Sequence, residues 1–514
     1  MTFKLLKFWP LIVLLIATFL LRIYKIEELL YFTYDESVPA FVGRRLALWG
    51  HIPLIGGVTP FNFHLAPYFY WFLAFILILG KLNPISWGVA SAILAMSTTF
   101  LIFLVGTKFF NRKVGFTGAI FWSFSYLANI YDRHLWALYW GPLLSMIVLF
   151  SLYKLIKGKQ NYIFLLAGAL AFGIHSDPSN LVFIIFTMLV WFLYNLPFNR
   201  KTLFACAIIL FSFLPLIIFD LRHNFANTKP VLDYIRAGNN NPGFEINKLL
   251  ENTLLFPRAF SRLVYPFGGN EIAKQYSYCP NFISEKYDAI PLYALLISSA
   301  LILTSVFWGL KNKKEHPGYF LIGLLTLVYF LGIHLYGTIL KADIFEHYIT
   351  GLFAVFLLIF ARFIILVSRK VWLVAIAIFI VINFYKLTQA NNSMGLLYKK
   401  QAISYTMEQV GDSPFSLDSL STCWKYSGYR YLFTVFGREP VKSYVDPNFG
   451  YLYGTTPIWP KHPEIVVSFV IHDFVPEKDI FYKRYAILKS HEISSKLFGN
   501  IEAIIIDNSS GWFD

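Results

Sequence analysis

The chain has 514 residues, of which 57% are hydrophobic and only 14% are charged. A soluble domain carries about 25% charged residues, so the composition excludes an ordinary soluble protein and predicts one that crosses a membrane many times. The net charge of +15 does not indicate a nucleic-acid-binding protein. Its lysines and arginines stand in short clusters between apolar runs, where they orient a membrane protein.

The apolar runs predict eleven membrane-spanning helices, because about 20 residues cross a bilayer. We expect the spans at residues 8–30, 85–106, 114–131, 137–153, 162–175, 180–196, 202–219, 291–310, 318–339, 348–367 and 371–386. The first span follows Lys4 and Lys7, as a signal peptide would, but it is too long for a signal-peptide core and lacks a small-residue cleavage site. We therefore interpret it as a retained span.

Basic clusters predict the orientation, because short cytoplasmic loops are enriched in lysine and arginine. The clusters are Lys4/Lys7, Lys108/Arg112/Lys113, Lys154/Lys157/Lys159, Arg200/Lys201, Lys311/Lys313/Lys314 and Arg369/Lys370. All of them fall on one side only if a further apolar run, residues 65–79, does not cross. That run suits a helix lying in the membrane interface. The prediction is a multi-pass protein of the plasma (cytoplasmic) membrane with a cytoplasmic N-terminus.

The spans divide the chain into two predicted domains. Residues 1–386 form a transmembrane domain with long outer loops at 31–84 and 220–290, the second with a short helix near 246–254. Residues 387–514 alternate helical and strand-like stretches, which predicts a small extracytoplasmic α/β domain. The expected fold is therefore a polytopic α-helical membrane protein with juxtamembrane helices in the first outer loop and an α/β domain at its C-terminus.

Asp35 and Glu36 directly follow the first span. A sugar that leaves a phosphate passes through an oxocarbenium-like transition state, and an inverting transferase needs a carboxylate to accept the acceptor's proton. Consecutive residues of a helix do not face each other, so we expect one carboxylate to point into a cavity and the other to support it. The alternative, which the sequence favours equally, is that Asp35 or Ser37 caps a helix and Glu36 is solvated.

The next outer segment carries Asp132, Arg133 and His134. Ionisable groups at membrane depth are costly and are usually functional or paired. The alternative here is an ion pair between Asp132 and Arg133 at the membrane boundary. His175 and Asp177 stand in a later segment, where a simple turn of serine, aspartate and proline is the favoured interpretation.

Further cations stand on the same predicted face. Arg222 and His223 end a span on the outside, against the positive-inside rule, which makes a phosphate contact plausible. Lys341 and His347 lie between two later spans; for the lysine, snorkelling to the interface is the alternative. A departing phosphate needs such cations or a metal ion to hold its charge.

These elements resemble, in their order, the superfamily of dolichyl-phosphate-mannose protein mannosyltransferases and aminoarabinose transferases, which are GT-C membrane glycosyltransferases. The resemblance covers about residues 5–225. It rests on the acidic pair after the first span, a juxtamembrane helix, and three segments: HIPLIGG at 51–57, HLAPYFYW at 64–71 and FDLRHNF at 219–225.

The resemblance implies a polyprenyl-phosphate sugar donor, an inverting transfer and a site that faces away from the cytosol. Asp35 resembles the family's essential acidic residue and Glu36 its neighbour. Asp132 resembles a second acidic residue, although Arg133 and His134 depart from the common pattern. No cofactor is certain, and a divalent metal ion stays open. The implied partners are the lipid donor, a glycan, lipid or protein acceptor, and membrane lipids; nucleic acid is not among them.

The sequence therefore predicts a glycosyltransferase in which Asp35 is the general base. The donor phosphate is expected at a set of outer residues: Asp132, Arg133, His134, Arg222, His223, Lys341 and His347. One alternative is a flippase or transporter of lipid-linked glycans, although such proteins usually show internal repeats and mid-membrane charges. The other is a transferase like the O-antigen ligases, which would use a lipid-diphosphate donor.

Overall fold

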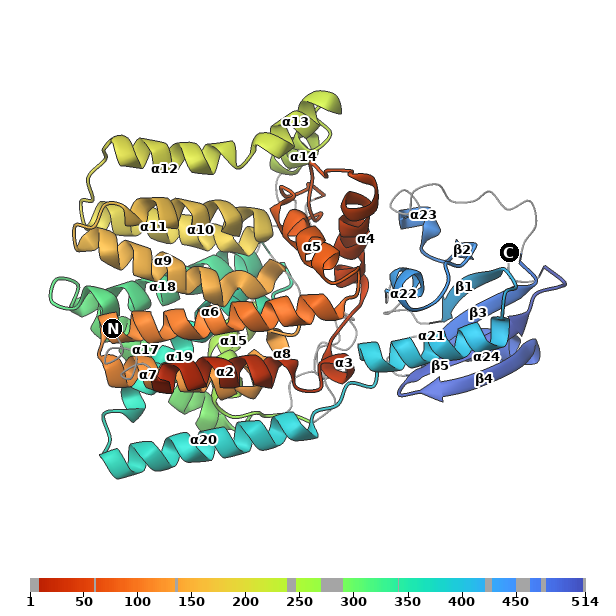
Figure 1. The fold of residues 1–514 in the computed structure, drawn as a ribbon. Helices are drawn as coiled ribbons and strands as arrows, with labels where there is room; N and C mark the ends of the chain where they lie inside the picture. The colour runs from red at the N-terminus through yellow and green to blue at the C-terminus, as the bar shows by residue number, and fades with distance from the viewer. Residues whose placement is uncertain are drawn as a thin grey trace.

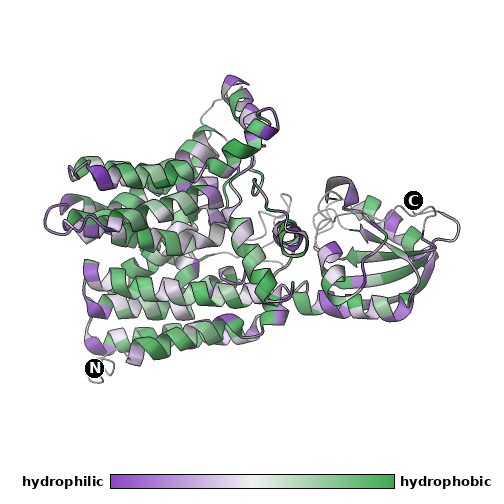
Figure 2. Cartoon of the chain, turned by 45° about the horizontal axis from the view of Figure 1, so that its top comes forward, coloured by the Kyte–Doolittle hydropathy of each residue, from purple (hydrophilic) through white to green (hydrophobic). Residues whose placement is uncertain are grey.

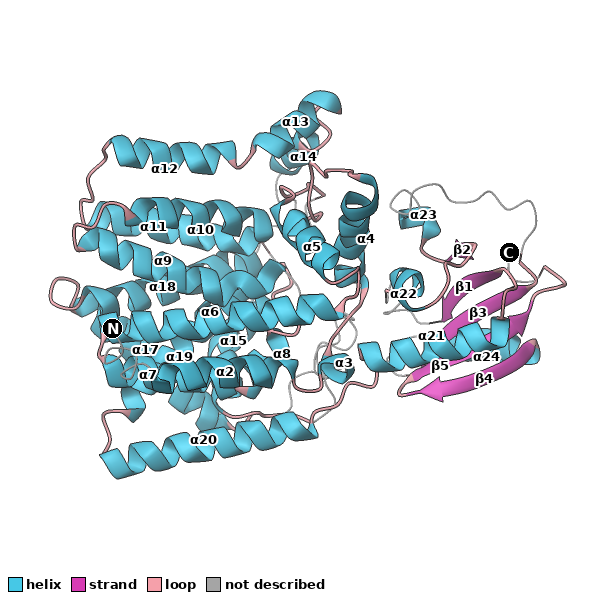
Figure 3. Ribbon diagram, viewed as in Figure 1, coloured by secondary structure: helices cyan, strands magenta, loops and turns pink. Residues whose placement is uncertain are grey.

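The structure, a computed structural model, describes residues 9–59, 62–134, 137–237, 246–269, 290–340, 342–420, 428–449, 463–472 and 478–511. Within these residues the chain forms a bundle of helices with a small sheet-containing part at one end (Figures 1 and 3). We call the residues after Gln389 the C-terminal part. The end of the bundle beside it is the sheet end.

The bundle contains helices that are long and apolar enough to cross a membrane. Six such helices occur in the described residues, with shorter apolar helices beside them, which confirms a polytopic α-helical membrane protein. The bundle helices are α2 (Trp9–Ile23), α6 (Ile85–Phe109), α7 (Arg112–Phe124), α8 (Tyr126–Tyr131), α9 (Gly141–Ile156), α10 (Tyr162–Ser176), α11 (Leu181–Leu193), α12 (Arg200–Phe211), α13 (Leu214–Arg222), α15 (Ile246–Val264), α17 (Leu292–Lys311), α18 (Pro317–Ile333), α19 (Phe353–Ile364) and α20 (Arg369–Gln389).

Short elements join these helices. They are α3 (Ile26–Leu29), η1 (Ala137–Trp140), η2 (Pro178–Asn180), α14 (Thr228–Ala237), η4 (His334–Ile339) and η5 (Glu346–Leu352). The predicted span 114–131 is divided at Ser125, which separates α7 from α8. The hydroxyl of Ser125 donates to the carbonyl of Leu263 on α15, so the break is a point of contact between elements.

The loops that carry the basic clusters lie together at the end of the bundle away from the sheet. They are the connections α6–α7, α9–α10, α11–α12, α17–α18 and α19–α20 (Figure 1). Hydrophilic residues gather at this end, whereas the helices are largely hydrophobic along their lengths (Figure 2). The basic clusters of residues 108–113, 154–159, 200–201, 311–314 and 369–370 therefore share one end of the bundle.

The first outer loop folds into two helices at the sheet end, α4 (Tyr34–Trp49) and α5 (Tyr68–Leu79). Thr33 is the N-cap of α4 and forms a capping box with Glu36, so neither Asp35 nor Ser37 is the cap. Gly50 ends the helix in the left-handed region, with φ of 66°, where glycine carries no steric penalty. α5 begins after α4 and leads through a turn into α6 at the same end of the bundle (Figure 1).

The second long outer loop contributes a bundle helix. The sequence predicts only a short helix near 246–254, but α15 runs from Ile246 to Val264. Its second half is buried, including Phe256, Phe260 and Arg262, because it packs against α17 and α19. The predicted helix ends too early because the charged and polar residues of its continuation pair inside the bundle instead of facing water.

The C-terminal part confirms the expected α/β architecture. Its strands are β1 (Phe415–Leu420), β2 (Lys442–Ser443), β3 (Ile465–Ile471), β4 (Glu492–Phe498) and β5 (Ile501–Asp507), and its helices are α21 (Leu396–Val410), α22 (Tyr429–Phe436), α23 (Asp446–Phe449) and α24 (Lys478–Ser490). The sheet order is β2-β1-β3-β5-β4. β1 is parallel to both β2 and β3, and β5 is antiparallel to its neighbours β3 and β4.

One hydrophobic core joins the C-terminal part to the first outer loop. The Tyr431 ring on α22 lies 5.5 Å from Phe32 and 5.2 Å from Phe41. Its hydroxyl donates to the carbonyl of Leu82, 2.8 Å away. Because apolar side chains from both regions are buried in the same cluster, the start of α4 is fixed from two directions, by the bundle and by the C-terminal part.

Candidate functional site

Glu36 is buried at the start of α4, with 1% of its surface exposed. Thr33 donates its backbone N–H and its hydroxyl to Oε2, each at 2.8 Å. His134 Nδ1 lies 3.2 Å from Oε1. Burial alone would raise the pKa of Glu36, but His134 and the bonds from Thr33 hold that pKa below its ordinary value. Glu36 is therefore a buried carboxylate whose two oxygens already have partners, and it is not solvated as the alternative interpretation required.

Asp35 precedes Glu36 in the first turn of α4. The structure describes its backbone within the helix, while its side chain lies outside the description. The N-terminal turn of a helix carries a partial positive charge that favours a carboxylate. The backbone of Asp35 is thus fixed by the capping box of Thr33 and Glu36 on either side of it.

Lys399 is a cation that sequence analysis missed. It lies on α21 with 1% of its surface exposed and donates from Nζ to the carbonyl of Phe32. Burial lowers its pKa to about 7, against the raising effect of the Glu36 charge. No pattern in the sequence places a residue of the C-terminal part against the segment that leads into α4, because the contact joins regions more than 360 positions apart in the chain.

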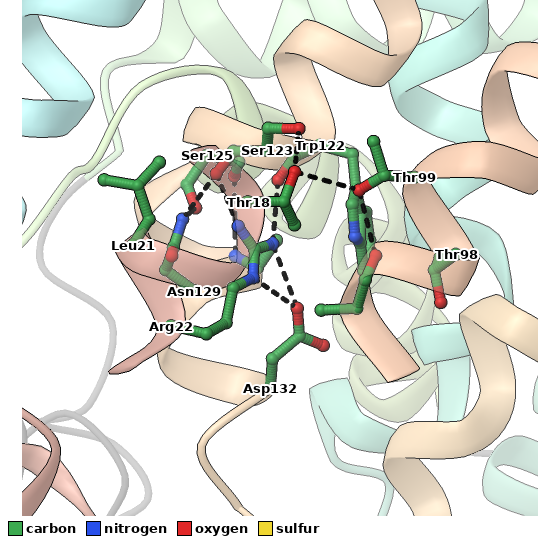
Figure 4. Close-up of polar contacts among 12 residues, drawn as sticks. Thr18, Leu21, Arg22, Thr98, Thr99, Trp122, Ser123, Ser125, Asn129 and Asp132 are labelled. Carbon is green, nitrogen blue, oxygen red and sulfur yellow. Dashed lines mark hydrogen bonds and ion pairs between the residues drawn. The ribbon is translucent and has the colours of Figure 1, made fainter. Parts of the chain in front are cut away.

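Asp132 is paired with Arg22 of α2 instead of with Arg133. Arg22 Nε lies 3.0 Å from Asp132 Oδ2, and the guanidinium also donates to the carbonyls of Trp122 and Ser123 at the end of α7 (Figure 4). Arg22 is 1% exposed. A signal for it existed in the sequence, since an arginine inside an apolar span is usually paired or functional.

Arg133 binds backbone carbonyls. Its Nη2 donates to the carbonyls of Leu21 at 2.7 Å and Tyr24 at 3.0 Å, and Nη1 donates to that of Asn129 at 2.7 Å. Such bonds satisfy the last carbonyls of a helix, here α2. The neighbouring residues 132, 133 and 134 therefore have different partners, and of the three His134 directly contacts Glu36.

A second buried ion pair joins α15 to η5. Arg262 Nη1 lies 2.6 Å from Glu346 Oε2, and the Tyr131 hydroxyl donates to Oε1 at 3.0 Å. His347 is the next residue and is buried, with its ring stacked on Phe345 at 5.3 Å. Sequence analysis missed Arg262. Lys341 lies outside the described residues.

Arg222 and His223 are exposed at the end of α13. The His223 ring stacks on Phe219 at 4.2 Å and its Nδ1 lies 2.8 Å from the Phe219 carbonyl. Within the described residues, no recorded contact joins either side chain to Glu36, Asp132 or Glu346. Their role as phosphate ligands stays a prediction.

The same segment is nevertheless attached to the first outer loop. Asp220 is buried and accepts bonds from the Asn227 N–H and the Thr228 hydroxyl, at 2.7 and 2.5 Å. Asn227 in turn bonds the backbone N–H and carbonyl of His64, at 2.5 and 3.1 Å. Two of the segments that carry the family resemblance, 64–71 and 219–225, are thus held in one structural unit.

A cavity of about 170 Å³ lies beside α4. Its lining is mostly apolar and consists of Val38, Pro39, Gly57, Val58, Leu65, Ala66, Phe69, Tyr70, Ala137, His175 and Ser176. Val38 and Pro39 follow Asp35 by three and four positions, so the cavity is one helical turn from the acidic pair. His175 lines it, whereas Asp177 accepts the Ser179 N–H at 2.8 Å, which confirms the predicted turn.

A metal ion does not fit the described part of this site. Within the described residues no group of three His, Cys, Asp or Glu side chains is arranged to hold one. The Glu36 oxygens are occupied by Thr33 and His134.

Comparisons with solved structures find likenesses of low sequence identity. ArnT from Cupriavidus metallidurans bound to undecaprenyl phosphate matches with 12% identity and a TM-score of 0.47, over 96% of this chain and 97% of that chain. The Archaeoglobus fulgidus oligosaccharyltransferase in complex with zinc and sulfate matches with 10% identity and a TM-score of 0.46, over 89% and 67%. The same organism's oligosaccharyltransferase AglB, with an inhibitory peptide and a dolichol-phosphate, matches with 12% identity and a TM-score of 0.43, over 90% and 69%.

At TM-scores below 0.5 the likeness adds no detail of chemistry. No protein-family model matches the chain, and no curated protein matches it in sequence.

Proposed function

We propose that this protein is a membrane glycosyltransferase that moves a sugar from a polyprenyl-phosphate donor to an acceptor hydroxyl with inversion. The observation that carries the proposal is the buried Glu36 carboxylate, held by Thr33 and His134 in the first turn of α4. It lies at the sheet end, opposite the basic loops. A buried ionic network at one membrane face, beside a second acidic residue, is costly and indicates a function.

In the proposed reaction Asp35 accepts the proton of the acceptor hydroxyl as the hydroxyl oxygen bonds to the anomeric carbon. The bond from that carbon to the phosphate oxygen breaks, and its electron pair leaves with the phosphate. Glu36 and His134 keep the first turn of α4 in place. Because lysine and arginine mark the cytoplasmic side, the reaction takes place on the extracytoplasmic face, where the C-terminal part also lies.

The test uses purified protein in lipid nanodiscs with a panel of polyprenyl-phosphate sugars and candidate acceptors. We expect release of polyprenyl phosphate with one donor class. Asp35→Asn lowers kcat by about 10²–10⁴-fold, the usual contribution of general base catalysis. The control is Asp412→Asn, an exposed aspartate of the C-terminal part, which leaves turnover unchanged.

Two outcomes would contradict the proposal. Intact donor with every sugar and acceptor would exclude the transferase, and a lipid-diphosphate donor would favour the ligase-like alternative. Unchanged turnover in Asp35→Asn would exclude Asp35 as the base while leaving the transferase itself in place.

A further inference from the structure

The C-terminal part contacts the backbone that leads into α4 at two consecutive points. The Leu396 N–H at the start of α21 donates to the carbonyl of Leu30, 3.2 Å away. One turn later, Lys399 Nζ donates to the carbonyl of Phe32. The two accepting carbonyls flank Tyr31, whose ring lies 4.5 Å from His134. The segment just before the N-cap of α4 is therefore held by α21.

A second element of the C-terminal part encloses the same segment. Gly428, at the start of α22, has φ of 84°, and a Cβ at this position would lie 2.7 Å from the Phe32 ring. The Lys399 ammonium lies over the Tyr429 ring at 5.5 Å. α21 thus contacts the Phe32 carbonyl through Lys399, and the start of α22 packs against the Phe32 ring.

Burial of a lysine at this position is energetically costly. A charged side chain removed from water needs compensation, and an apolar side chain of similar volume is often neutral or stabilising in place of a buried ion. Stability alone therefore does not explain Lys399. Its ammonium donates to the carbonyl that precedes the capping residue Thr33 and is favoured electrostatically by the charge of Glu36, which points to control of the geometry there.

We infer that Lys399 is a positioning residue for the acidic pair. By holding the Phe32 carbonyl, it fixes the entry to α4 and hence the orientation of the turn that carries Asp35 and Glu36. The C-terminal part is then a component of the catalytic apparatus and not an independent module. The effect on catalysis rests on the proposed function above, whereas the attachment of α21 to the segment before α4 is measurable without any substrate.

The first measurement is hydrogen exchange of the intact protein in nanodiscs, without substrate. Lys399→Met removes the donor at similar volume. The matched control is Lys400→Met, the next residue, which forms a surface pair with Glu27 at 3.5 Å. We expect exchange in residues 30–41 to rise about tenfold or more in Lys399→Met, the scale of losing a hydrogen bond to a charged group, and to stay unchanged in the control. Unchanged exchange in β3 and β5 shows that the C-terminal part remains folded.

The second measurement separates positioning from general stability. A misplaced acidic pair lowers kcat by about tenfold or more with the KM of the donor nearly constant, because the lost interaction acts in the transition state. Lys399→Gln retains a hydrogen-bond donor. We expect this variant to recover part of the protection of residues 30–41 against hydrogen exchange and part of kcat. If Lys399→Met does not fold, the comparison of Lys399→Gln with Lys400→Gln carries the test, with a smaller rise in exchange expected.

Two results overturn the inference. One is a folded Lys399 variant in which residues 30–41 exchange at the wild-type rate. The other is faster exchange with unchanged kcat. If the wild-type protein transfers no sugar from any donor, the proposed function fails, and the exchange comparison still supports or overturns the attachment by itself.

Discussion

Glu36 and Asp35 are neighbours in one helical turn but have different chemical capacities. Both oxygens of Glu36 accept hydrogen bonds inside the protein, and His134 keeps its pKa below the ordinary value. A carboxylate with these partners is a poor base, because protonation would break interactions that favour the charged form. The sequence predicts one reactive and one supporting carboxylate, and we therefore propose that Glu36 is the supporting one.

The titration of Lys399 predicts a distinct pH dependence of stability. Its pKa of about 7 lies below the value of an unfolded lysine, about 10.4. Between these values the unfolded state binds more protons, so this residue's contribution to the free energy of unfolding rises with pH. Below pH 7 both states are protonated and the cost of burying the charge is constant.

The measurement is thermal or denaturant unfolding of the wild type and of Lys399→Met from pH 6 to 9. We expect the difference in free energy of unfolding, wild type minus variant, to increase above pH 7 by up to about 1.4 kcal/mol per pH unit. Subtraction removes the contributions of groups that titrate independently of Lys399. A difference that is flat across this range would contradict the assignment of the pKa.

At the scale of elements, α2, α7 and α8 are joined by a buried polar cluster. The Thr18 hydroxyl lies 2.7 Å from that of Ser123, and Arg22 bonds Asp132 as well as the carbonyls at the end of α7 (Figure 4). These contacts fix the position of residues 132–134, and through His134 they support Glu36. The first span is thus attached to the site by its last turn.

Removing one partner of this ion pair is expected to destabilise the fold. Arg22→Leu leaves Asp132 buried without its cation, which costs about 3–5 kcal/mol, whereas replacing both partners by leucine costs much less. The measurement is a double-mutant cycle of unfolding in detergent. Lys25→Met, which removes a half-exposed pair with Glu28, is the control and changes stability by less than about 1 kcal/mol. Additive effects of Arg22→Leu and Asp132→Leu would contradict the pairing.

The apolar runs could be predicted from the sequence, because the hydrophobic length of a span is a local property. The division of span 114–131 at Ser125 and the full length of α15 could not, since both depend on hydrogen bonds and ion pairs between distant elements. The same reason explains which residues of the candidate site could be predicted from the sequence. Asp35, Glu36 and His134 are marked by their place after a span, whereas Lys399 and Arg262 meet their partners, the Phe32 carbonyl and Glu346, only after folding.

At the scale of the whole molecule, the basic loops and the C-terminal part lie at opposite ends of the bundle (Figure 1). The positive-inside rule predicts that the C-terminal part is extracytoplasmic. Single cysteines in a background without native cysteines test this orientation in intact cells. We expect Asp412→Cys to react with a membrane-impermeant maleimide, and Lys159→Cys, in the α9–α10 loop, to react only after permeabilisation. The reverse pattern would place the candidate site on the cytoplasmic face and contradict the proposed donor.

The shared hydrophobic core of α4, α5 and the C-terminal part lies at the sheet end of the molecule. It includes Phe69 and Tyr70, which also line the cavity beside Val38 and Pro39. We therefore expect the lipid phosphate to bind at this end, near the start of α4. The most direct measurement is the structure of the protein in nanodiscs with added polyprenyl phosphate. We expect density for the phosphate at the first turn of α4, beside Asp35, with the polyprenyl chain leading into the bilayer; a phosphate bound at the basic end of the bundle would contradict the account.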